Sequence, residues 1–542
     1  MRNHISGNIF KILLSAFVLL LVGAACVKDE PLSTGAYEPA PMSPVVFYGK
    51  EPSPKEASSG QTVTFEVKGL KTVGNFRFFV NQIEAEVVSI TDSLITVKIP
   101  ENASTGPGTV LTSDGQYFYG PNVTITGKVY IDPDFEGGIG TNGPITDVYS
   151  SDLAGHIMVG AFTDYKGRSS SNPVNSIVKI NNSGIYVAYN AGLGMQGGRA
   201  NTLLPLNTAA SSFLIGGYMS RYGVRPVSNV TRVFSNGALD SMVVDMINPE
   251  PQKFPQNSRD TVPTFNGYFS GEVIKMFKDA TNKNVILGNG NLYYRYYYTR
   301  AQKNAVQRDF TFMRNFVRVS DDGVLDSTFN FNPATGQSFD GLNGFITTAI
   351  QLPNKTIMFG GLFTKFNDVE GLGRIAVLNN TGGINMTYKS AFGTGANGLI
   401  SKMTYNATTK KILVTGAFTE FNGFKTNGIV MLNEDGSVDR SFVTRAFEGG
   451  VPNYAGQLKN GRILVSGTFN KYDQYPRLGF MVLNPDGSLA AGYNNTGAFS
   501  GVINGLYETA SVQGVPAVLL YGNFNTFDNK KVGNLVQINM LP

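Results

Sequence analysis

Cysteine, histidine and tryptophan are nearly missing from this chain: its 542 residues contain one Cys, two His and no Trp. A single cysteine excludes intramolecular disulfides and clustered thiolate metal ligands. His4 lies ahead of an N-terminal apolar run, so His156 is the one histidine left for the body of the chain. Histidine-based zinc sites and His/Cys catalytic pairs are therefore excluded, and we predict no metal, no cofactor and no identifiable catalytic residue.

Charged side chains are also scarce. They make up 15 % of residues, and the net charge of +5 is spread along the chain without a long Lys/Arg block. Nucleic-acid binding requires a concentrated basic stripe, so the composition predicts no nucleic-acid partner. The 39 acidic residues include no pair that stands out by spacing. A glycosidase needs only two acids at a set separation in space, so an enzyme stays an open alternative.

Only one apolar run is long, and it lies at the N-terminus. Residues 12–25 (ILLSAFVLLLVGAA) follow Arg2 and Lys11 and end in small residues. A charged start, an apolar centre and a small-residue end form the layout of a secretory signal peptide. Spanning a bilayer takes about 20 residues. This run of 14 therefore predicts a cleaved signal over residues 1–25 rather than a membrane helix.

The single cysteine, Cys26, stands directly after this run in the sequence LVGAAC. This arrangement resembles the lipobox of bacterial lipoproteins, which implies cleavage before Cys26 and acylation of its thiol by membrane lipid. Lys28, Asp29 and Glu30 are similar to the short signal that sends lipoproteins of Bacteroidetes to the outside of the outer membrane. The expectation is a lipid-anchored outer-membrane protein that faces the extracellular side. The alternatives are an incidental cysteine and a solvated charge cluster.

Glycine and aromatic residues are abundant, with 63 Gly, 37 Phe and 25 Tyr. With few charges, this composition is typical of all-β proteins with many turns. Residues 26–43 carry three prolines and no apolar period, which predicts an extended tether. Residues 44–126 contain short β-rich runs such as TVTFEVK and SLITVKIP. They resemble an Ig-like IPT/TIG domain, which implies a β-sandwich that acts as a spacer or interaction module.

From residue 128 the chain repeats itself. Seven apolar β runs each enter a marker glycine, and these are Gly160, Gly216, Gly288, Gly361, Gly416, Gly467 and Gly522. A strand-like run precedes each marker and another follows it. Several copies then have an Asn-Gly or Asp-Gly pair, suited to a type I′ hairpin turn, before a fourth run. Four antiparallel strands per unit, repeated seven times, predict a β-propeller over residues 128–542, with seven blades in preference to six or eight.

The two ends of the propeller are predicted to meet. The last copy stops after its third strand, and residues 128–135 (KVYIDPDF) resemble the fourth-strand pattern of other copies. The N-terminal strand should therefore complete the last blade. Residues 411–442 look like the delta-60 repeat, a propeller repeat of secreted and surface bacterial proteins; the third copy departs from it, because Gly290 replaces the aromatic residue. That resemblance implies a fold and no activity.

Two insertions, residues 246–269 and 291–314, interrupt the repeats, and the strand order places both on one face of the propeller. Loops on a rigid scaffold often carry binding sites. Tyrosines at alternate positions of an extended segment share one side, where their rings can stack on sugars, and arginines can pair with carboxylate or sulfate groups. The candidate ligand-binding residues are Tyr294, Arg295, Tyr296, Tyr298 and Arg300. A hairpin that packs its own aromatic side chains is the alternative.

Acidic residues in the turns do not predict a metal site. Loops such as NEDGSVD (433–439) supply one or two carboxylates, fewer than a calcium loop requires. Asp326 and Asp439 fall at equivalent places in the fourth runs of their repeats, which indicates a structural role.

These observations predict a surface lipoprotein in which an anchor, a tether and an Ig-like spacer carry a propeller. The expected function is non-catalytic binding of an extracellular polysaccharide or glycoprotein during glycan capture. Two alternatives remain. One is a propeller glycosidase or lyase, and the other is a protein–protein adhesion module that partners an outer-membrane transporter.

Overall fold

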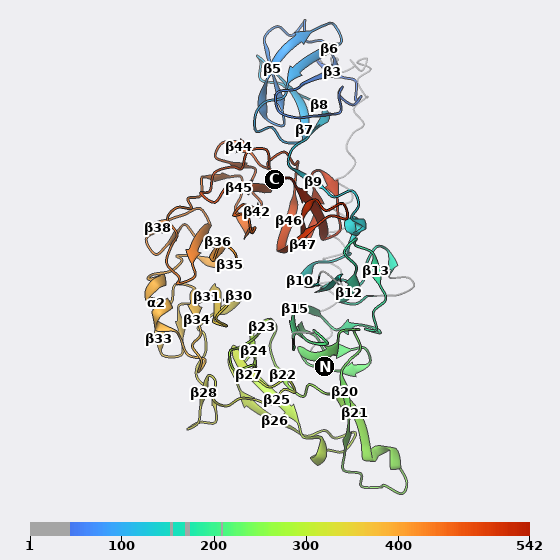
Figure 1. The fold of residues 1–542 in the computed structure, drawn as a ribbon, viewed down its shortest axis with the longest axis vertical. Helices are drawn as coiled ribbons and strands as arrows, with labels where there is room; N and C mark the ends of the chain where they lie inside the picture. Colours follow the sequence, from blue (N-terminus) through green and yellow to red (C-terminus); the bar gives the residue numbers. More distant parts are fainter. Residues whose placement is uncertain (1–43, 152–154, 169–173, 208–209) are drawn as a thin grey trace, which may run out of the picture.

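The computed structural model describes residues 44–151, 155–168, 174–207 and 210–542. The predicted signal, anchor and tether, with Cys26, Lys28, Asp29 and Glu30, lie outside these ranges. The described part of the chain is all-β, as predicted, with a β-sandwich at one end and a ring of β-sheets beside it (Figure 1). Within these ranges, no helix is long and apolar enough to cross a membrane.

The sandwich is an eight-stranded sheet that folds over on itself. β5 bends it, because this strand pairs with β4 through Ile83–Ala85 and with β6 through Glu86–Ile90. The two layers meet in an apolar core, where the ring centroids of Phe65 and Phe78 lie 5.2 Å apart. In sheet order, the strands are β1 (Val46–Phe47), β3 (Thr62–Lys68), β6 (Leu94–Lys98), β5 (Ile83–Ile90), β4 (Phe76–Val80), β7 (Gly106–Thr112), β8 (Tyr117–Ile125) and β2 (Glu56–Ala57).

Seven sheets follow in chain order around the ring, one for each repeat of the sequence (Figure 1). The first strand of each sheet lines the centre. From the centre outward, the strands of the first four sheets are β10 (Ile145–Ser151), β11 (Gly155–Gly160), β12 (Ile177–Ile180) and β13 (Tyr186–Val187); β15 (Arg199–Pro205), β16 (Ser212–Tyr218) and β19 (Val230–Phe234); β23 (Val273–Lys278), β24 (Asn284–Gly288) and β27 (Phe316–Val319); and β30 (Phe345–Gln351), β31 (Ile357–Leu362) and β34 (Ile375–Val377). Those of the last three are β35 (Leu399–Asn406), β36 (Lys411–Ala417) and β39 (Ile429–Asn433); β41 (Pro452–Gln457), β42 (Ile463–Gly467) and β45 (Phe480–Leu483); and β46 (Ser500–Ala510), β47 (Pro516–Phe527), β49 (Leu535–Met540) and β9 (Val129–Ile131).

Strand β9 closes the ring, because it pairs antiparallel with β49 at the end of the chain. This confirms that the N-terminal strand completes the last sheet. Elsewhere the predicted fourth strand is shorter than expected: it has two residues in β13 and is a single bridge in the next five sheets. Asp326 and Asp439 show the cause. Their carboxylates accept hydrogen bonds from the backbone N–H two residues later, which turns the chain away from the sheet.

The Asn-Gly and Asp-Gly turns differ from the predicted type I′. A type I′ turn needs a positive φ at both central residues, but in each pair only the glycine has one, as at Gly436 with φ of 88°. The prediction is therefore wrong. In this loop the N–H of Gly436 donates to the carbonyl of Asn433 at 3.0 Å. The Asp435 carboxylate favours this form, because it accepts the N–H of Ser437 at 2.9 Å and so stays on the outside of the turn.

Every inner strand contains a β-bulge at the same point, and the bulges join the sheets into a ring. The unpaired residues are, in chain order, Thr146, Asn201, Ile274, Thr347, Ser401, Asn453 and Asn504. Five of these side chains donate to a carbonyl of the next sheet. Thr146 Oγ1 lies 2.6 Å from Ala200 O, and Asn504 Nδ2, in the last sheet, lies 2.8 Å from Ile145 O in the first.

A glycine lies opposite each bulge. A Cβ atom at any of seven positions would collide with a carbonyl oxygen of the inner strand or of the residue directly before it, and these positions are Gly160, Gly217, Gly288, Gly361, Gly416, Gly467 and Gly522. Six of them are the predicted markers. In the second repeat the equivalent residue is Gly217, so the marker Gly216 is one residue out of register.

Short ribbons and short helices lie at the rim of the ring. The ribbons are β14 (Met195–Gln196), β17 (Arg221–Tyr222) and β18 (Arg225–Pro226); β28 (Phe331–Asn332) and β29 (Gln337–Ser338); β32 (Lys365–Phe366) and β33 (Val369–Glu370); β37 (Glu420–Phe421) and β38 (Phe424–Lys425); β40 (Phe447–Glu448), β43 (Lys471–Tyr472) and β44 (Tyr475–Pro476); and β48 (Lys530–Lys531). The helices are η1 (Glu136–Ile139) and α2 (Met386–Phe392), the latter capped by the side chain of Asn385.

Asn495 fixes the sandwich to the propeller. Its Nδ2 atom donates to Ile125 O at 3.1 Å and to Val129 O at 2.8 Å, on either side of the connection between the two units. Its backbone carbonyl accepts the N–H of Thr105 at 2.8 Å. One side chain of the propeller thus holds both the last strand of the sandwich and the strand that closes the ring.

Candidate functional site

The two insertions form hairpins that project from the ring at the end opposite the sandwich (Figure 1). The first contains η3 (Pro255–Ser258), β21 (Arg259–Pro263) and β22 (Tyr268–Phe269), and β21 pairs with β20 (Ser241–Asp245), which directly precedes the insertion. The second contains β25 (Leu292–Tyr296), η4 (Tyr298–Arg300) and β26 (Arg308–Phe312). They lie side by side, as the sequence predicts: Ile247 N–H donates to Ala301 O at 2.9 Å, and Met246, Val262 and Tyr298 share a small apolar core.

The predicted tyrosines do lie on one side of their segment and pack against one another. Tyr294 stacks on Tyr268 of the first insertion, with centroids 4.9 Å apart and planes 11° apart. The ring of Tyr296 packs edge-on against both of these rings, and its centroid lies 5.8 Å from the ring centroid of Tyr298. Tyr268 and Tyr298 are buried. Burial raises the pKa of Tyr268, Tyr296 and Tyr298, so these phenols stay protonated at neutral pH.

The residues on the other side of the segment are held by the fold. Tyr293 is 2 % exposed, and its hydroxyl donates to Gly323 O at 2.7 Å. Arg295 Nε donates to Asn266 O at 2.9 Å. The guanidinium of Arg300 lies 5.4 Å from the ring centroid of Tyr297. Tyr298 and Arg295 therefore brace the hairpin, Arg300 is exposed, and Tyr294 and Tyr296 remain half-buried at its surface.

Strand β26 supplies the exposed part of the site. Phe310 lies directly opposite Tyr294 in the ladder, and Phe312 lies opposite Leu292, so their side chains share the face of the stacked tyrosines. Phe310 is 60 % exposed and Phe312 is 42 % exposed. The Arg308 guanidinium lies 5.5 Å from the ring centroid of Tyr294. We call Tyr294, Tyr296, Arg308, Phe310 and Phe312 the aromatic face.

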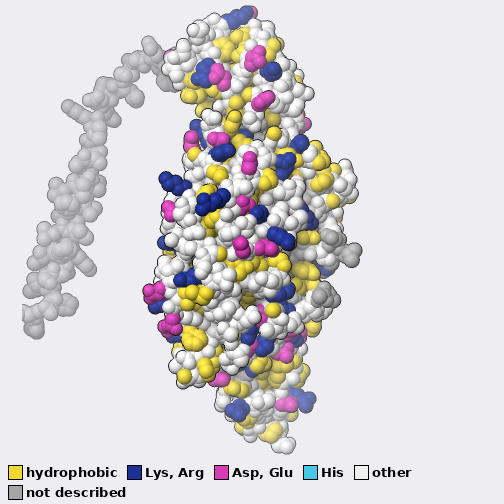
Figure 2. All heavy atoms as spheres, turned by 60° about the vertical axis from the view of Figure 1, so that its left-hand side comes forward, with side chains coloured by type: hydrophobic (Ala, Val, Ile, Leu, Met, Phe, Trp, Pro, Cys, Tyr) yellow, Lys and Arg dark blue, Asp and Glu magenta, His cyan; other side chains and the backbone are white. Residues whose placement is uncertain are grey.

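Solvent exposure increases across the three strands, from Tyr268 beneath the aromatic face to Phe310 at its edge. Tyr268 is 3 % exposed at its base, Tyr294 is half-buried above it, and Phe310 is largely exposed. Figure 2 shows this end of the molecule, at the bottom of the view, with hydrophobic side chains among Lys, Arg, Asp and Glu side chains. The alternating pattern in RDFTF (308–312) is the sequence signal for Phe310 and Phe312, while nothing in the sequence pairs Tyr268 with Tyr294.

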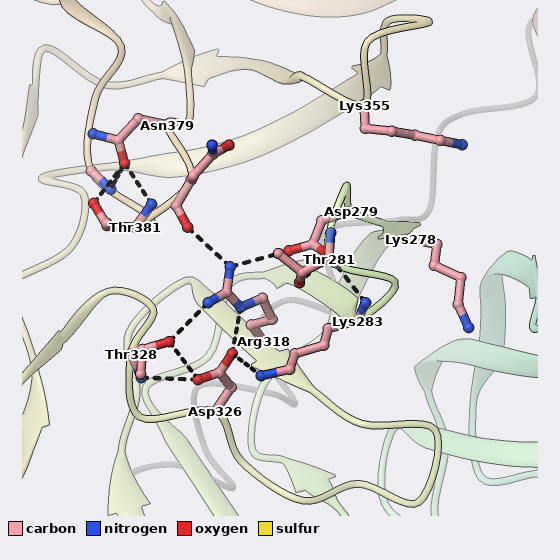
Figure 3. A network of polar contacts seen from close by, with 12 residues as sticks. Lys278, Asp279, Thr281, Lys283, Arg318, Asp326, Thr328, Lys355, Asn379 and Thr381 are labelled. Carbon is pink, nitrogen blue, oxygen red and sulfur yellow. Dashed lines mark hydrogen bonds and ion pairs between the residues drawn. The ribbon is translucent and has the colours of Figure 1, made fainter.

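The repeated acids are structural, as predicted. Asp326 accepts hydrogen bonds from Arg318 Nε and Lys283 Nζ, each at 2.7 Å, and Arg318 also reaches Asp279 at 3.1 Å (Figure 3). Burial opposes ionisation of Asp326, but hydrogen bonds from Lys283, Thr328 and Arg318 hold its pKa below the ordinary value. Asp439 likewise pairs with Lys411 at 2.7 Å.

The arginine also ties two sheets together. Arg318 Nη1 donates to Asn380 O of the fourth sheet at 2.9 Å (Figure 3). The second sheet repeats this arrangement, since Arg232 pairs with Asp240 at 2.7 Å and reaches Asp321 O of the third sheet at 3.1 Å. Among the residues that the structure describes, no group of three or more His, Cys, Asp or Glu side chains is placed to hold a metal ion.

Two family models match parts of the chain. Residues 23–121 match a domain of unknown function (DUF5008). Residues 409–442 and 458–489 match a domain of unknown function described as a β-propeller (DUF5122). The second match covers the run 411–442 from which the propeller repeat was predicted and supports the fold. The likeness of residues 44–126 to IPT/TIG domains stays a prediction. No curated protein matches the chain in sequence.

Several solved structures resemble the chain at low similarity. The WD40 β-propeller domain of Doa1 is 12 % identical, with a TM-score of 0.38 over 76 % of this chain and 97 % of its own. An auxiliary nutrient binding protein from Bacteroides thetaiotaomicron is 10 % identical, with a TM-score of 0.29 over 92 % of this chain and 98 % of its own. At these scores, neither likeness carries an argument about what this chain binds.

Proposed function

We propose that this protein is a lipid-anchored lipoprotein on the outer face of a bacterial outer membrane, and that it binds an extracellular polysaccharide or glycoprotein without cleaving it. The anchor is Cys26, and Lys28, Asp29 and Glu30 supply the export signal. The ligand contacts the aromatic face. The single observation that carries the binding function is the graded row from Tyr268 through Tyr294 to Phe310.

Aromatic rings held rigidly at a surface suit the apolar C–H faces of sugar rings. Stacking gains contact area, and little side-chain entropy is lost when the ring is already braced from below. Tyr268 braces Tyr294 at 4.9 Å, and Phe310, directly opposite Tyr294 in the ladder, offers the exposed ring surface of the row. The tyrosine hydroxyls and the Arg308 guanidinium at the margin offer hydrogen-bond donors to sugar hydroxyls.

The position of the aromatic face also suits capture. It lies at the end of the long axis opposite the sandwich (Figure 1). In a protein anchored ahead of the sandwich, this end is the one that points away from the membrane. Asp240 and Asp326 are engaged in ion pairs with arginines that also bond to the neighbouring sheet, which favours binding over acid–base chemistry at those positions.

A glycan array tests this function. The purified chain is applied to plant, host and microbial polysaccharides, and each positive is titrated against the Phe310→Ala variant. We expect an affinity loss of at least about tenfold, or 1.4 kcal/mol. Phe234→Ala is the matched control, because Phe234 is 43 % exposed on β19, outside the aromatic face. Equal loss in both variants, or in neither, would show that the ligand does not use this face.

The same assay separates the alternatives. Soluble products released from a bound polymer would replace the binding function with that of a glycosidase or lyase. A chain that binds no polysaccharide but co-purifies with an integral outer-membrane protein would instead be an adhesion module of a transporter.

A further inference from the structure

The centre of the ring is a second chemically distinctive place. A cavity of about 570 Å³ lies there, and residues from the inner strands of all seven sheets line it. Such a volume is typical of sites for small organic ligands. It lies away from the aromatic face, in residues that the proposed function does not use.

The bulges put one set of residues at the same position in all seven inner strands, and all of the set except Asp147 and Thr202 line the cavity. The residue after each bulge is, in chain order, Asp147, Thr202, Lys275, Thr348, Lys402, Tyr454 and Gly505. Lys275 Nζ reaches from the third sheet to Asp147 Oδ2 of the first at 2.8 Å. The same carboxylate oxygen accepts the N–H of Leu203 at 3.0 Å. Asp147 and Lys275 therefore neutralise one another.

A second pair of opposite charges, in the wall of the cavity, also neutralises itself. Arg199 Nη2 lies 2.6 Å from Glu272 Oε1, and Asn201 Nδ2 donates to the same oxygen at 2.7 Å. Lys402 is different. Although it lines the cavity and is half-buried, its ammonium forms no ion pair or hydrogen bond with another residue of the described ranges. The charges of the cavity thus sum to one uncompensated cation.

Two tyrosine hydroxyls accompany this cation. Tyr454, which is 1 % exposed, and Tyr521 both line the cavity, and neither hydroxyl is hydrogen-bonded to another residue that the structure describes. Glycine makes room for each. A Cβ atom at Gly456 would collide with the Tyr454 hydroxyl, and one at Gly505 would collide with the Tyr521 hydroxyl. Both hydroxyls can therefore donate into the cavity, which suits a ligand with acceptor oxygens.

We propose that the central cavity binds a small organic carboxylate of the size of a sugar acid, with Lys402 as its counter-ion and the hydroxyls of Tyr454 and Tyr521 as further donors. One cation and two neutral donors match a single negative charge with two acceptor oxygens. A dianion such as phosphate would bring a second negative charge that no group of the cavity neutralises. This site is independent of the aromatic face, and either can exist without the other.

The acid–base properties of the cluster give the site a pH dependence. Burial and the neighbouring charge of Lys275 lower the pKa of Lys402 to about 8, against the opposing effect of Asp147. Burial raises the pKa of Tyr454 and Tyr521, so both stay protonated donors. The charged and titratable groups that line or adjoin the cavity are Asp147, Arg199, Glu272, Lys275, Lys402, Tyr405, Tyr454 and Tyr521. Because Lys402 loses its charge as pH rises through about 8, carboxylate affinity should fall there.

Isothermal titration calorimetry on the full chain tests the site with four probes: glucuronate, inorganic phosphate, sulfate and glucose. We expect glucuronate to bind at about pH 7, at least about tenfold more weakly at pH 9.5, and the other three not to bind. Preferred binding of phosphate or sulfate would overturn the assignment to a carboxylate. Failure of every probe at millimolar concentration would overturn the site.

Two variants locate the ligand. Lys402→Met keeps the length of the side chain and should lower glucuronate affinity at least about tenfold without lowering the melting temperature, because it removes a desolvated charge. Tyr521→Phe removes one hydroxyl and should weaken binding several-fold. Lys365→Met, at an exposed Lys–Glu pair on the rim, is the matched control. Undiminished binding by Lys402→Met would refute the proposal, and retained carboxylate binding by Phe310→Ala would confirm its independence from the aromatic face.

Discussion

Replacing Asp326 by Asn should destabilise the propeller by about 3 kcal/mol. The side chains of Arg318 and Asp326 are 7 % and 6 % exposed, and their charged atoms lie 2.7 Å apart. Removing one partner of a buried ion pair costs about 3–5 kcal/mol, because it leaves the other charge buried. The lower end of that range applies, since Arg318 keeps its contacts to Asp279 at 3.1 Å and to Asn380 O at 2.9 Å.

Urea denaturation followed by circular dichroism measures this change, and the chain has no Trp to serve as a fluorescence probe. Asp368→Asn, at an exposed loop position, is the control and should lie within about 0.5 kcal/mol of the parent chain. The double variant Arg318→Met/Asp326→Leu should recover at least about 1 kcal/mol, because no charge of the pair is then left buried. Parent-like stability of Asp326→Asn would refute the reasoning.

The pH dependence of the same variant provides a further check. The folded-state pKa of Asp326 is lowered by its hydrogen bonds, so its contribution is present above the unfolded pKa of about 3.9 and is lost as pH falls through the folded value. The stability difference between the parent chain and Asp326→Asn should therefore be full at neutral pH and shrink below about pH 4. A difference that stays constant down to about pH 2 would mean that the carboxylate charge is not its source.

Two other substitutions test the anchor and the ring. Cys26→Ser should move the protein from the outer-membrane fraction to the soluble fraction while leaving its propeller folded, and fractionation with limited proteolysis checks both; retention in the membrane would contradict the lipid anchor. Gly361→Ala should destabilise the fourth sheet by about 1–3 kcal/mol, because the new Cβ meets the carbonyl of Phe345, whereas Gly371→Ala has open space around it and tests only the cost of a positive φ. A larger loss at Gly371 than at Gly361, measured by urea denaturation, would contradict the steric argument.

The repeat architecture could be predicted because each repeat carries its own pattern. An apolar run that enters a glycine recurs seven times, and each recurrence supplies one sheet. The closing strand could be predicted for the same reason, since KVYIDPDF fits the pattern that the last copy lacks. The turn type could not, because Asp-Gly is compatible with several hairpins and the choice depends on where the Asp435 carboxylate finds a donor.

The sites were harder to predict because they depend on pairing between distant segments. Alternation correctly places Tyr294, Tyr296 and Tyr298 on one side, but it cannot show that Tyr268 covers Tyr294 or that Phe310 lies beside it. The cavity is still harder to predict from the sequence. A bulge shifts the alternation by one residue, and only the closed ring brings Asp147, Lys275 and Lys402 close together.

The amide of Asn495 gives the molecule a mechanical property. If the chain is anchored ahead of the sandwich and binds a polymer at the opposite end, as proposed, a pull between the two would reach the propeller through the connection to β9, a strand of only three residues. Asn495 is hydrogen-bonded to Ile125 and Val129, on both sides of that connection. It would therefore take up part of the force before the force reaches the pairing between β9 and β49. The contacts that would carry this force, the Asn495 hydrogen bonds and the β9–β49 pairing, are also the contacts that close the ring. Breaking them would open the propeller as well as separate it from the sandwich.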